Sequence, residues 1–161
     1  MSRQLFTASR VVPAAPEEIF ALLADPARHV EMDGSGTVQR LVAGRGHMQL
    51  GSEFTMAMKA FGVPYRITSR VVEYEENRLI AWCHLGKNLW RYELEPGEDG
   101  TRVTESADYT SMRFQPVSRW LVRDQLIEDS IATTLDNLVK RFSIRGSGFS
   151  GEDVGPYPRN P

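Results

Sequence analysis

Hydrophobic and polar residues alternate over much of the chain before residue 110, a pattern that predicts β-strands. Extended runs rich in β-branched and aromatic residues cover 4–12, 37–43, 50–60, 64–75, 78–85, 89–95 and 101–110. Short segments with glycine, proline or asparagine separate the last six runs. Because parallel strands would need crossovers of a dozen residues or more, we expect a seven-stranded antiparallel sheet.

Helical spacing replaces this alternation in two regions. A short helix is expected from Pro16 until Asp25-Pro26 breaks it, since proline fits the first helical position and the two glutamates after it favour the positive end of the helix dipole. A second short turn is expected over 27–32. Apolar residues at helical spacing predict a long helix over 116–142. We therefore predict one α+β domain over 1–144 and a Gly/Pro-rich tail over 145–161.

Composition and charge narrow the classes of function. Nineteen Lys and Arg against 21 Asp and Glu give a net charge of −2, which offers no electrostatic reason to bind nucleic acid or anionic lipid. One cysteine and three histidines favour neither a disulfide nor a zinc site. With no apolar run of membrane-helix length and no signal peptide, we expect a cytoplasmic protein without integral membrane contact, metal or other cofactor.

A sheet that curves around a long helix can leave a ligand cavity between them. Alternation in the strands and the apolar stripe of the long helix predict the inward-facing, ligand-binding set: Phe54, Met56, Met58, Tyr65, Ile67, Trp82, Trp90, Tyr92, Tyr109, Trp120, Ile127 and Ile131. In strand 78–85 a two-residue turn would instead direct Ala81 and Cys83 inward, and we favour Trp82. The alternative is that the whole set only fills a core.

Three local motifs resemble the START/Bet v 1-like (SRPBCC) superfamily, and within it the bacterial polyketide cyclase/dehydrase-like proteins. The motifs are the strand–proline–helix opening VPAAPEEIFALLADP at 12–26, IAW at 80–82 and DGTRVTE at 99–105. The resemblance implies a helix-grip fold, in which the curved sheet wraps around the C-terminal helix. It also implies a deep cavity for a lipid, polyketide, hormone or other apolar ligand. Because the superfamily includes carriers, receptors and cyclases, it implies no single chemistry.

Two carboxylates are candidate catalytic groups. Asp124 falls within the apolar stripe of the long helix, where a carboxylate must face a polar cavity or find a partner. Otherwise it lies at a solvated helix end or binds an arginine. Glu105 points inward if Val103 does, and otherwise lies at the rim or in a salt bridge. Two interior carboxylates could divide acid and base roles.

These observations leave three functions open. The first is a carrier or sensor that binds a small hydrophobic molecule, lipid-like or polyketide-like, in the cavity. The second is a polyketide cyclase, aromatase or dehydratase, a lyase or isomerase that uses Asp124 or Glu105 and neither metal nor nucleotide. The third is an interaction module with a closed core. The tail could pack on its own domain or on a neighbour, so the oligomeric state stays open and a homodimer is possible.

Overall fold

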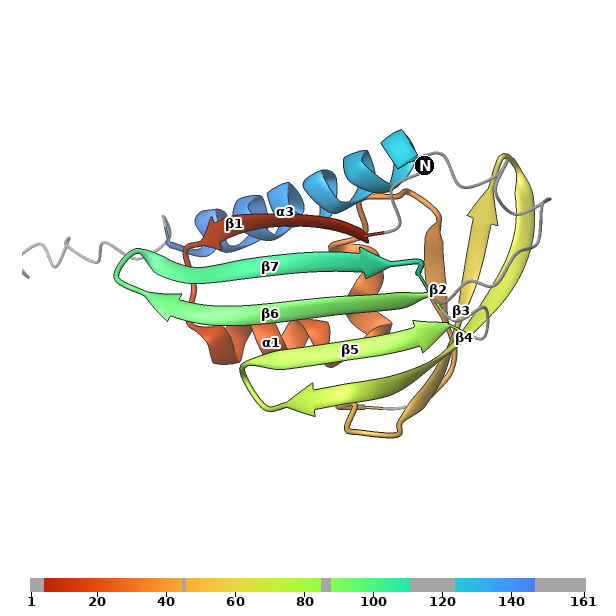
Figure 1. Ribbon diagram of the computed structural model, residues 1–161, viewed down its shortest axis with the longest axis horizontal. Helices are drawn as coiled ribbons and strands as arrows, with labels where there is room; N and C mark the ends of the chain where they lie inside the picture. The colour runs from red at the N-terminus through yellow and green to blue at the C-terminus, as the bar shows by residue number, and fades with distance from the viewer. Residues whose placement is uncertain (1–4, 45, 85–87, 111–123, 147–161) are drawn as a thin grey trace, which may run out of the picture.

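The computed structural model describes residues 5–44, 46–84, 88–110 and 124–146 and has an α+β helix-grip fold, as predicted (Figure 1). Seven antiparallel strands form one curved sheet in the order β1-β7-β6-β5-β4-β3-β2. The strands are β1 (Leu5–Val12), β2 (Val38–Ala43), β3 (Glu53–Ala60), β4 (Val63–Glu75), β5 (Leu79–His84), β6 (Leu89–Gly97) and β7 (Gly100–Asp108). The helices are α1 (Pro16–Leu23), the 3-10 helix η1 (Pro26–Glu31) and α3 (Asp124–Gly146).

Helix α3 lies along β1 and β7 and buries an apolar stripe (Figure 1). The buried side chains of this stripe are Ile127, Ile131, Leu135, Leu138 and Phe142. They join the core formed by α1 and the inner face of the sheet. The helix ends four residues beyond the predicted end at 142, and its predicted first residues, 116–123, lie outside the described residues, as does the tail from 147 onward.

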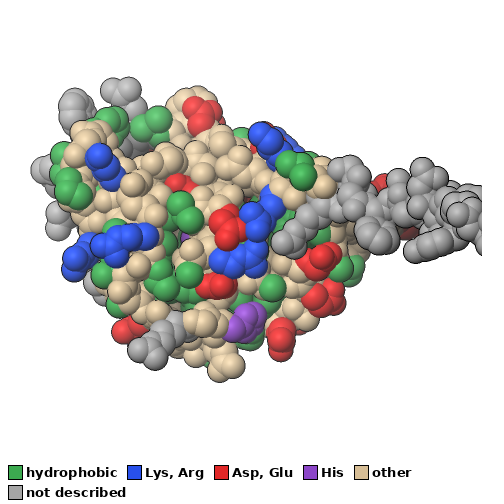
Figure 2. All heavy atoms as spheres, turned by 180° about the vertical axis from the view of Figure 1, so that it is seen from behind, with side chains coloured by type: hydrophobic (Ala, Val, Ile, Leu, Met, Phe, Trp, Pro, Cys, Tyr) green, Lys and Arg blue, Asp and Glu red, His purple; other side chains and the backbone are tan. Residues whose placement is uncertain are grey.

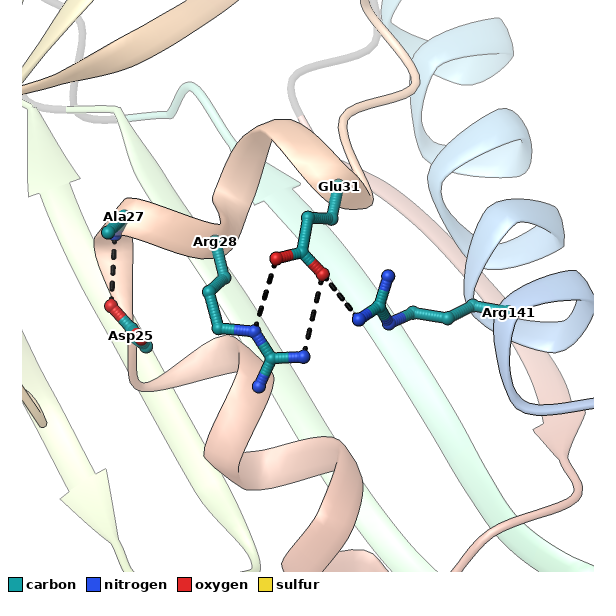
Figure 3. Close-up of polar contacts among 5 residues, drawn as sticks. All are labelled: Asp25, Ala27, Arg28, Glu31 and Arg141. Atoms are coloured by element: carbon teal, nitrogen blue, oxygen red, sulfur yellow. Dashed lines mark hydrogen bonds and ion pairs between the residues drawn. The ribbon is translucent and has the colours of Figure 1, made fainter. Parts of the chain in front are cut away.

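The short helices after β1 are held by local polar contacts (Figure 3). The Asp25 carboxylate accepts a hydrogen bond from the Ala27 backbone N–H at 3.1 Å, which satisfies a free donor at the start of η1. Glu31, at the end of η1, pairs with Arg28 at 3.3 Å and with Arg141 of α3 at 2.5 Å. Of these two half-exposed ion pairs only the one with Arg141 links η1 to α3, and it fixes the position of η1 more than it stabilises the fold.

The register of the central strands settles the orientation of β5. Trp82 lies opposite Trp90, and Ile80 lies opposite Tyr92, so Trp82 shares the inner face with both β6 aromatics, as we favoured. A register shift between Val71 and Glu73 marks a β-bulge at Val72, the residue that interrupts the alternation in β4. The bulge turns Glu73 outward, where it pairs with Arg91 at 2.8 Å.

A tight two-residue turn joins β3 to β4. Ala60 pairs with Val63, and the two residues between them, Phe61 and Gly62, have φ of +50° and +81°. Positive φ at both positions is typical of a type I′ turn, which favours asparagine or aspartate followed by glycine. A bulky residue such as Phe61 is strained in this left-handed region.

The described helices include none that combines the length and apolar character needed to span a membrane.

Candidate functional site

A cavity of about 320 Å³ lies between the inner face of the sheet, η1 and α3. Ten of the twelve residues predicted to bind ligand line it: Phe54, Met56, Met58, Tyr65, Ile67, Trp82, Trp90, Tyr92, Tyr109 and Ile127. Ile131 is buried in the core and is not part of this lining, and Trp120 lies outside the described residues. The volume is at the lower end of the range for small-molecule sites.

Glu105 is the most unusual group on the cavity lining, because its carboxyl is fully buried and pairs with no cation among the described residues. Its Oε1 accepts two hydrogen bonds, from Trp90 Nε1 at 2.7 Å and from the Tyr92 hydroxyl at 2.8 Å. Its Oε2 is buried and has no hydrogen-bond partner among the residues that the structure describes. Buried polar atoms are almost always satisfied, so an unpartnered oxygen on a cavity lining points to a ligand.

Strand pairing explains how these three side chains meet. Tyr92 of β6 lies directly opposite Glu105 of β7, and Trp90 lies two residues before Tyr92 on the same face. Val103 and Ala107 are also buried, which confirms the alternation that sends Glu105 inward. The alternative of a rim or salt-bridged position for Glu105 is wrong.

The surroundings of Glu105 favour its neutral form. Burial raises the pKa of Glu105 to about 8, and the Asp33 carboxylate adds to the rise, whereas the bonds from Tyr92 and Trp90 oppose it. Burial also raises the pKa of Tyr92 well above its usual value, so this hydroxyl stays a donor. Because Oε1 already accepts two bonds, the carboxyl proton resides on Oε2. At neutral pH Glu105 is therefore an O–H donor on the cavity lining.

An aromatic cluster extends the lining from Tyr92 toward η1. Trp82 contacts Tyr92 with ring centroids 5.5 Å apart and Phe54 edge-on at 5.8 Å. His29 stacks on Trp82 at 5.0 Å, and its Nε2 donates to the Leu23 carbonyl at 2.9 Å. Burial lowers the pKa of His29, so the ring is neutral and its Nδ1 is an acceptor. The cluster forms a flat apolar surface suited to an aromatic or conjugated ligand.

A second polar pair, Ser69 and His84, lies on the lining at neighbouring positions of β4 and β5. The Ser69 hydroxyl and His84 Nδ1 are 2.7 Å apart. Burial lowers the pKa of His84 to about 4, so the imidazole is neutral and can accept from the hydroxyl. The described part of the chain brings no three His, Cys, Asp or Glu residues together as a possible metal site.

Helix α3 is fastened to the segment after η1. Gly34 donates its backbone N–H to Thr134 Oγ1 at 3.0 Å, and Asn137 donates to the Met32 carbonyl at 3.3 Å. A Cβ on Gly34 would collide with the backbone of α3 at Ser130 and Thr134. This close approach sets the distance between η1 and α3, and with it the size of the cavity at that side.

Asp124, the other predicted catalytic residue, is the first described residue of α3 and is half-buried. It is not among the residues that line the cavity, whose second carboxylate is Asp33. Both Asp33 oxygens accept hydrogen bonds from the following turn, from Ser35 at 3.0 Å and Val38 at 3.0 Å. Among the described residues, the cavity thus holds one hydrogen-bonded carboxylate and one neutral carboxyl with a free oxygen.

Sequence reasoning missed several polar residues of the lining, among them His29, Asp33 and His84. His29 and Asp33 resemble an ordinary helix end and turn, and only the tertiary fold places them against the sheet. For His84 a signal existed. Alternation puts it on the face of Trp82, so the choice of an inward Trp82 also directs His84 inward.

Comparison with known proteins identifies a matching family, a relative of similar sequence and solved structures with the same fold. The sequence profile of the family described as polyketide cyclase/dehydrase and lipid transport matches residues 3–143. The uncharacterized protein Rv0088 of Mycobacterium tuberculosis is 48% identical over 99 residues, which cover 61% of this chain and 44% of that protein. The match therefore spans less than half of that relative's length.

Solved structures share the fold at low sequence identity. Protein Ms6760 from Mycobacterium smegmatis superposes with a TM-score of 0.67 at 14% identity, covering 88% of this chain and 92% of that chain. The Polyketide_cyc-like protein Cgl2372 from Corynebacterium glutamicum gives a TM-score of 0.60 at 20% identity, covering 93% and 98%. At sequence identities this low, the similarity shows a common fold and gives no evidence of a common ligand.

Proposed function

The chain belongs to the polyketide cyclase/dehydrase and lipid transport family, and from this we propose that its cavity binds a neutral, largely apolar molecule with one hydrogen-bond-accepting oxygen. The observation that carries the proposal is Glu105, a buried carboxyl whose Oε2 finds no partner in the described part of the chain. A carbonyl or hydroxyl oxygen of the ligand would accept the proton of Oε2 and satisfy it.

The charge of the lining favours a neutral ligand over a fatty-acid anion. Among the described residues the lining includes no Lys or Arg, and it includes the Asp33 carboxylate. An anion placed there would lose its hydration without gaining a cation from the described residues. The aromatic and methionine side chains favour a flat or flexible apolar body, which is typical of ketones, esters and polyketide-like molecules.

To act as a carrier or sensor, the protein needs only to bind the ligand at this site and need not catalyse a reaction. Glu105 also supports a second candidate function, a cyclase or dehydratase reaction in which the carboxyl protonates a substrate oxygen. A pKa near 8 suits a proton donor at neutral pH. Glu105→Gln separates the two functions, because glutamine keeps a neutral N–H donor and loses the transferable proton.

We expect the wild-type protein at pH 6.5 to bind 2-acetylnaphthalene roughly tenfold more tightly than 2-ethylnaphthalene. The two probes differ in shape only slightly, and only the ketone can accept the Glu105 proton. Titration followed by Trp fluorescence gives both affinities. At pH 9 the ionised carboxylate cannot donate, and the preference for the ketone should disappear.

A variant at the same position supplies the first control. Glu105→Gln should keep the preference at both pH values, because its amide N–H donates whether or not the pH is raised. Met56→Trp, which fills the cavity, should weaken binding of both probes. Equal affinities for ketone and hydrocarbon in the wild-type protein at pH 6.5 would contradict the proposed role of Glu105.

A further inference from the structure

The tip of the β3–β4 hairpin is exposed and apolar. Phe61 is 86% exposed, more than any other large hydrophobic side chain in the described part of the chain, and Val63 is 64% exposed. Phe61 occupies a left-handed position where asparagine would be favoured. Phe61 therefore stabilises neither the core nor the turn. A residue that contradicts the local conformational preference in this way is found mostly at functional sites.

The part of this hairpin nearest its tip carries a local positive charge that the net charge of the chain conceals. Residues 54–72 include one Lys and two Arg and no Asp or Glu, in a chain whose net charge is −2. Arg40, Lys59 and Arg66 are exposed and line one shallow hollow on the outer face of β2, β3 and β4. Among the described residues none of the three forms an ion pair.

Figure 2 views the molecule from behind and shows basic side chains beside hydrophobic ones at the left, where the sheet end with β3 and β4 lies. The hairpin also reaches the cavity, because Met58 and Tyr65 line it from the inner face of the same two strands. Tyr65 and Leu126 of α3 line the cavity and are also exposed, so part of the cavity rim lies beside the hairpin.

We propose that this hairpin docks on an anionic lipid bilayer, with Phe61 and Val63 inserted among the headgroups and Arg40, Lys59 and Arg66 against lipid phosphates. An aromatic tip flanked by basic residues is the pattern of interfacial binding. Two apolar side chains on a narrow turn are too small for a stable protein interface, which buries far more surface. Docked in this way, the part of the cavity rim beside the hairpin would face the bilayer, where an apolar ligand resides.

Sedimentation with vesicles tests the proposal. The wild-type chain should bind vesicles of phosphatidylcholine and phosphatidylglycerol, and high salt or vesicles of phosphatidylcholine alone should release most of it. Phe61→Asn should weaken binding roughly fivefold or more. Lys59→Gln and Arg66→Gln should each weaken it about fivefold. Leu50→Asn, which removes another exposed apolar residue in the loop between β2 and β3, should leave binding unchanged.

Two further measurements keep the outcomes distinct. Phe61→Asn should melt no lower than the wild-type protein, because asparagine fits the turn, and should bind 2-acetylnaphthalene as the wild-type protein does. If the protein does not bind vesicles, the proposal of a ligand site at Glu105 therefore still stands on the probe-binding measurements. Equal binding to neutral vesicles, unchanged binding of Phe61→Asn, or self-association through Phe61 in sedimentation velocity without vesicle binding would each overturn the proposal.

Discussion

The Glu105→Gln variant is expected to abolish a loss of stability that the wild-type protein shows as the pH rises above 6.5. The folded-state pKa of Glu105 is about 8, whereas the ordinary pKa of a glutamate is 4.5. Between these values the unfolded chain releases this proton and the native protein retains it. Stability then falls as pH rises, by about 1.4 kcal/mol per pH unit until the folded carboxyl also ionises.

Below pH 6.5 the two histidines of the cavity make the stability rise with pH, which is opposite to the effect of Glu105. The pKa values of His29 and His84 are lowered, the latter to about 4, so the unfolded state binds more protons than the native state below pH 6.5. The contribution of these two histidines to the free energy of unfolding rises with pH. It is complete near pH 6.5, the pKa of a histidine in the unfolded chain. The wild-type protein should therefore be most stable near pH 6.5 and lose about 2 kcal/mol between pH 6.5 and 8.5 through Glu105.

Urea unfolding at a series of pH values measures this difference. The profile of Glu105→Gln should stay flat above pH 6.5, since a glutamine does not ionise. Glu95→Gln, which changes an exposed glutamate of the same sheet, is the matched control and should follow the wild-type profile. Parallel profiles for Glu105→Gln and the wild-type protein would mean that the buried carboxyl does not retain its proton.

Gly34→Ala is expected to destabilise the fold by about 3 kcal/mol. The new methyl group would collide with the Ser130 carbonyl oxygen and the Thr134 amide nitrogen, which belong to one turn of α3. Backbone atoms inside a helix cannot move singly, so α3 would shift as a body. The shift would stretch the hydrogen bond from Gly34 to Thr134 and open the cavity between η1 and α3.

Thermal unfolding and probe binding together test this expectation. Gly34→Ala should lower the melting temperature and weaken binding of 2-acetylnaphthalene. Gly97→Ala should have little effect, because its new Cβ would meet only the Gly100 carbonyl oxygen at an ordinary 3.5 Å. A melting temperature of Gly34→Ala equal to that of Gly97→Ala would show that α3 is not held close to the loop after η1.

The fold could be predicted from local features of the sequence. Alternation and short turns identify all seven strands, and Pro16 and Asp25-Pro26 mark the boundaries of α1 and η1. The least regular run, 64–75, is where the bulge at Val72 interrupts the strand. Helix α3 continues four residues beyond the predicted end at 142, because Ser143 and the residues after it lack the apolar spacing that indicates a helix.

The site was predicted less completely, because its polar groups depend on contacts distant in sequence. The aromatic and methionine positions follow from alternation within single strands. The neutral state of Glu105 follows instead from the pairing of β6 with β7 and from burial beneath α3. His29 enters the cavity through its stacking on Trp82, more than fifty residues away, and no local pattern contains that information.

The central claim, that Glu105 carries its proton at neutral pH, is tested most directly by infrared spectroscopy. The difference spectrum between the wild-type protein and Glu105→Gln, recorded across a pH titration, isolates the carbonyl stretch of this one protonated carboxyl. We predict that the band persists through pH 7 and disappears with a midpoint near pH 8. A midpoint near the ordinary value for glutamate, below pH 5, would contradict the account.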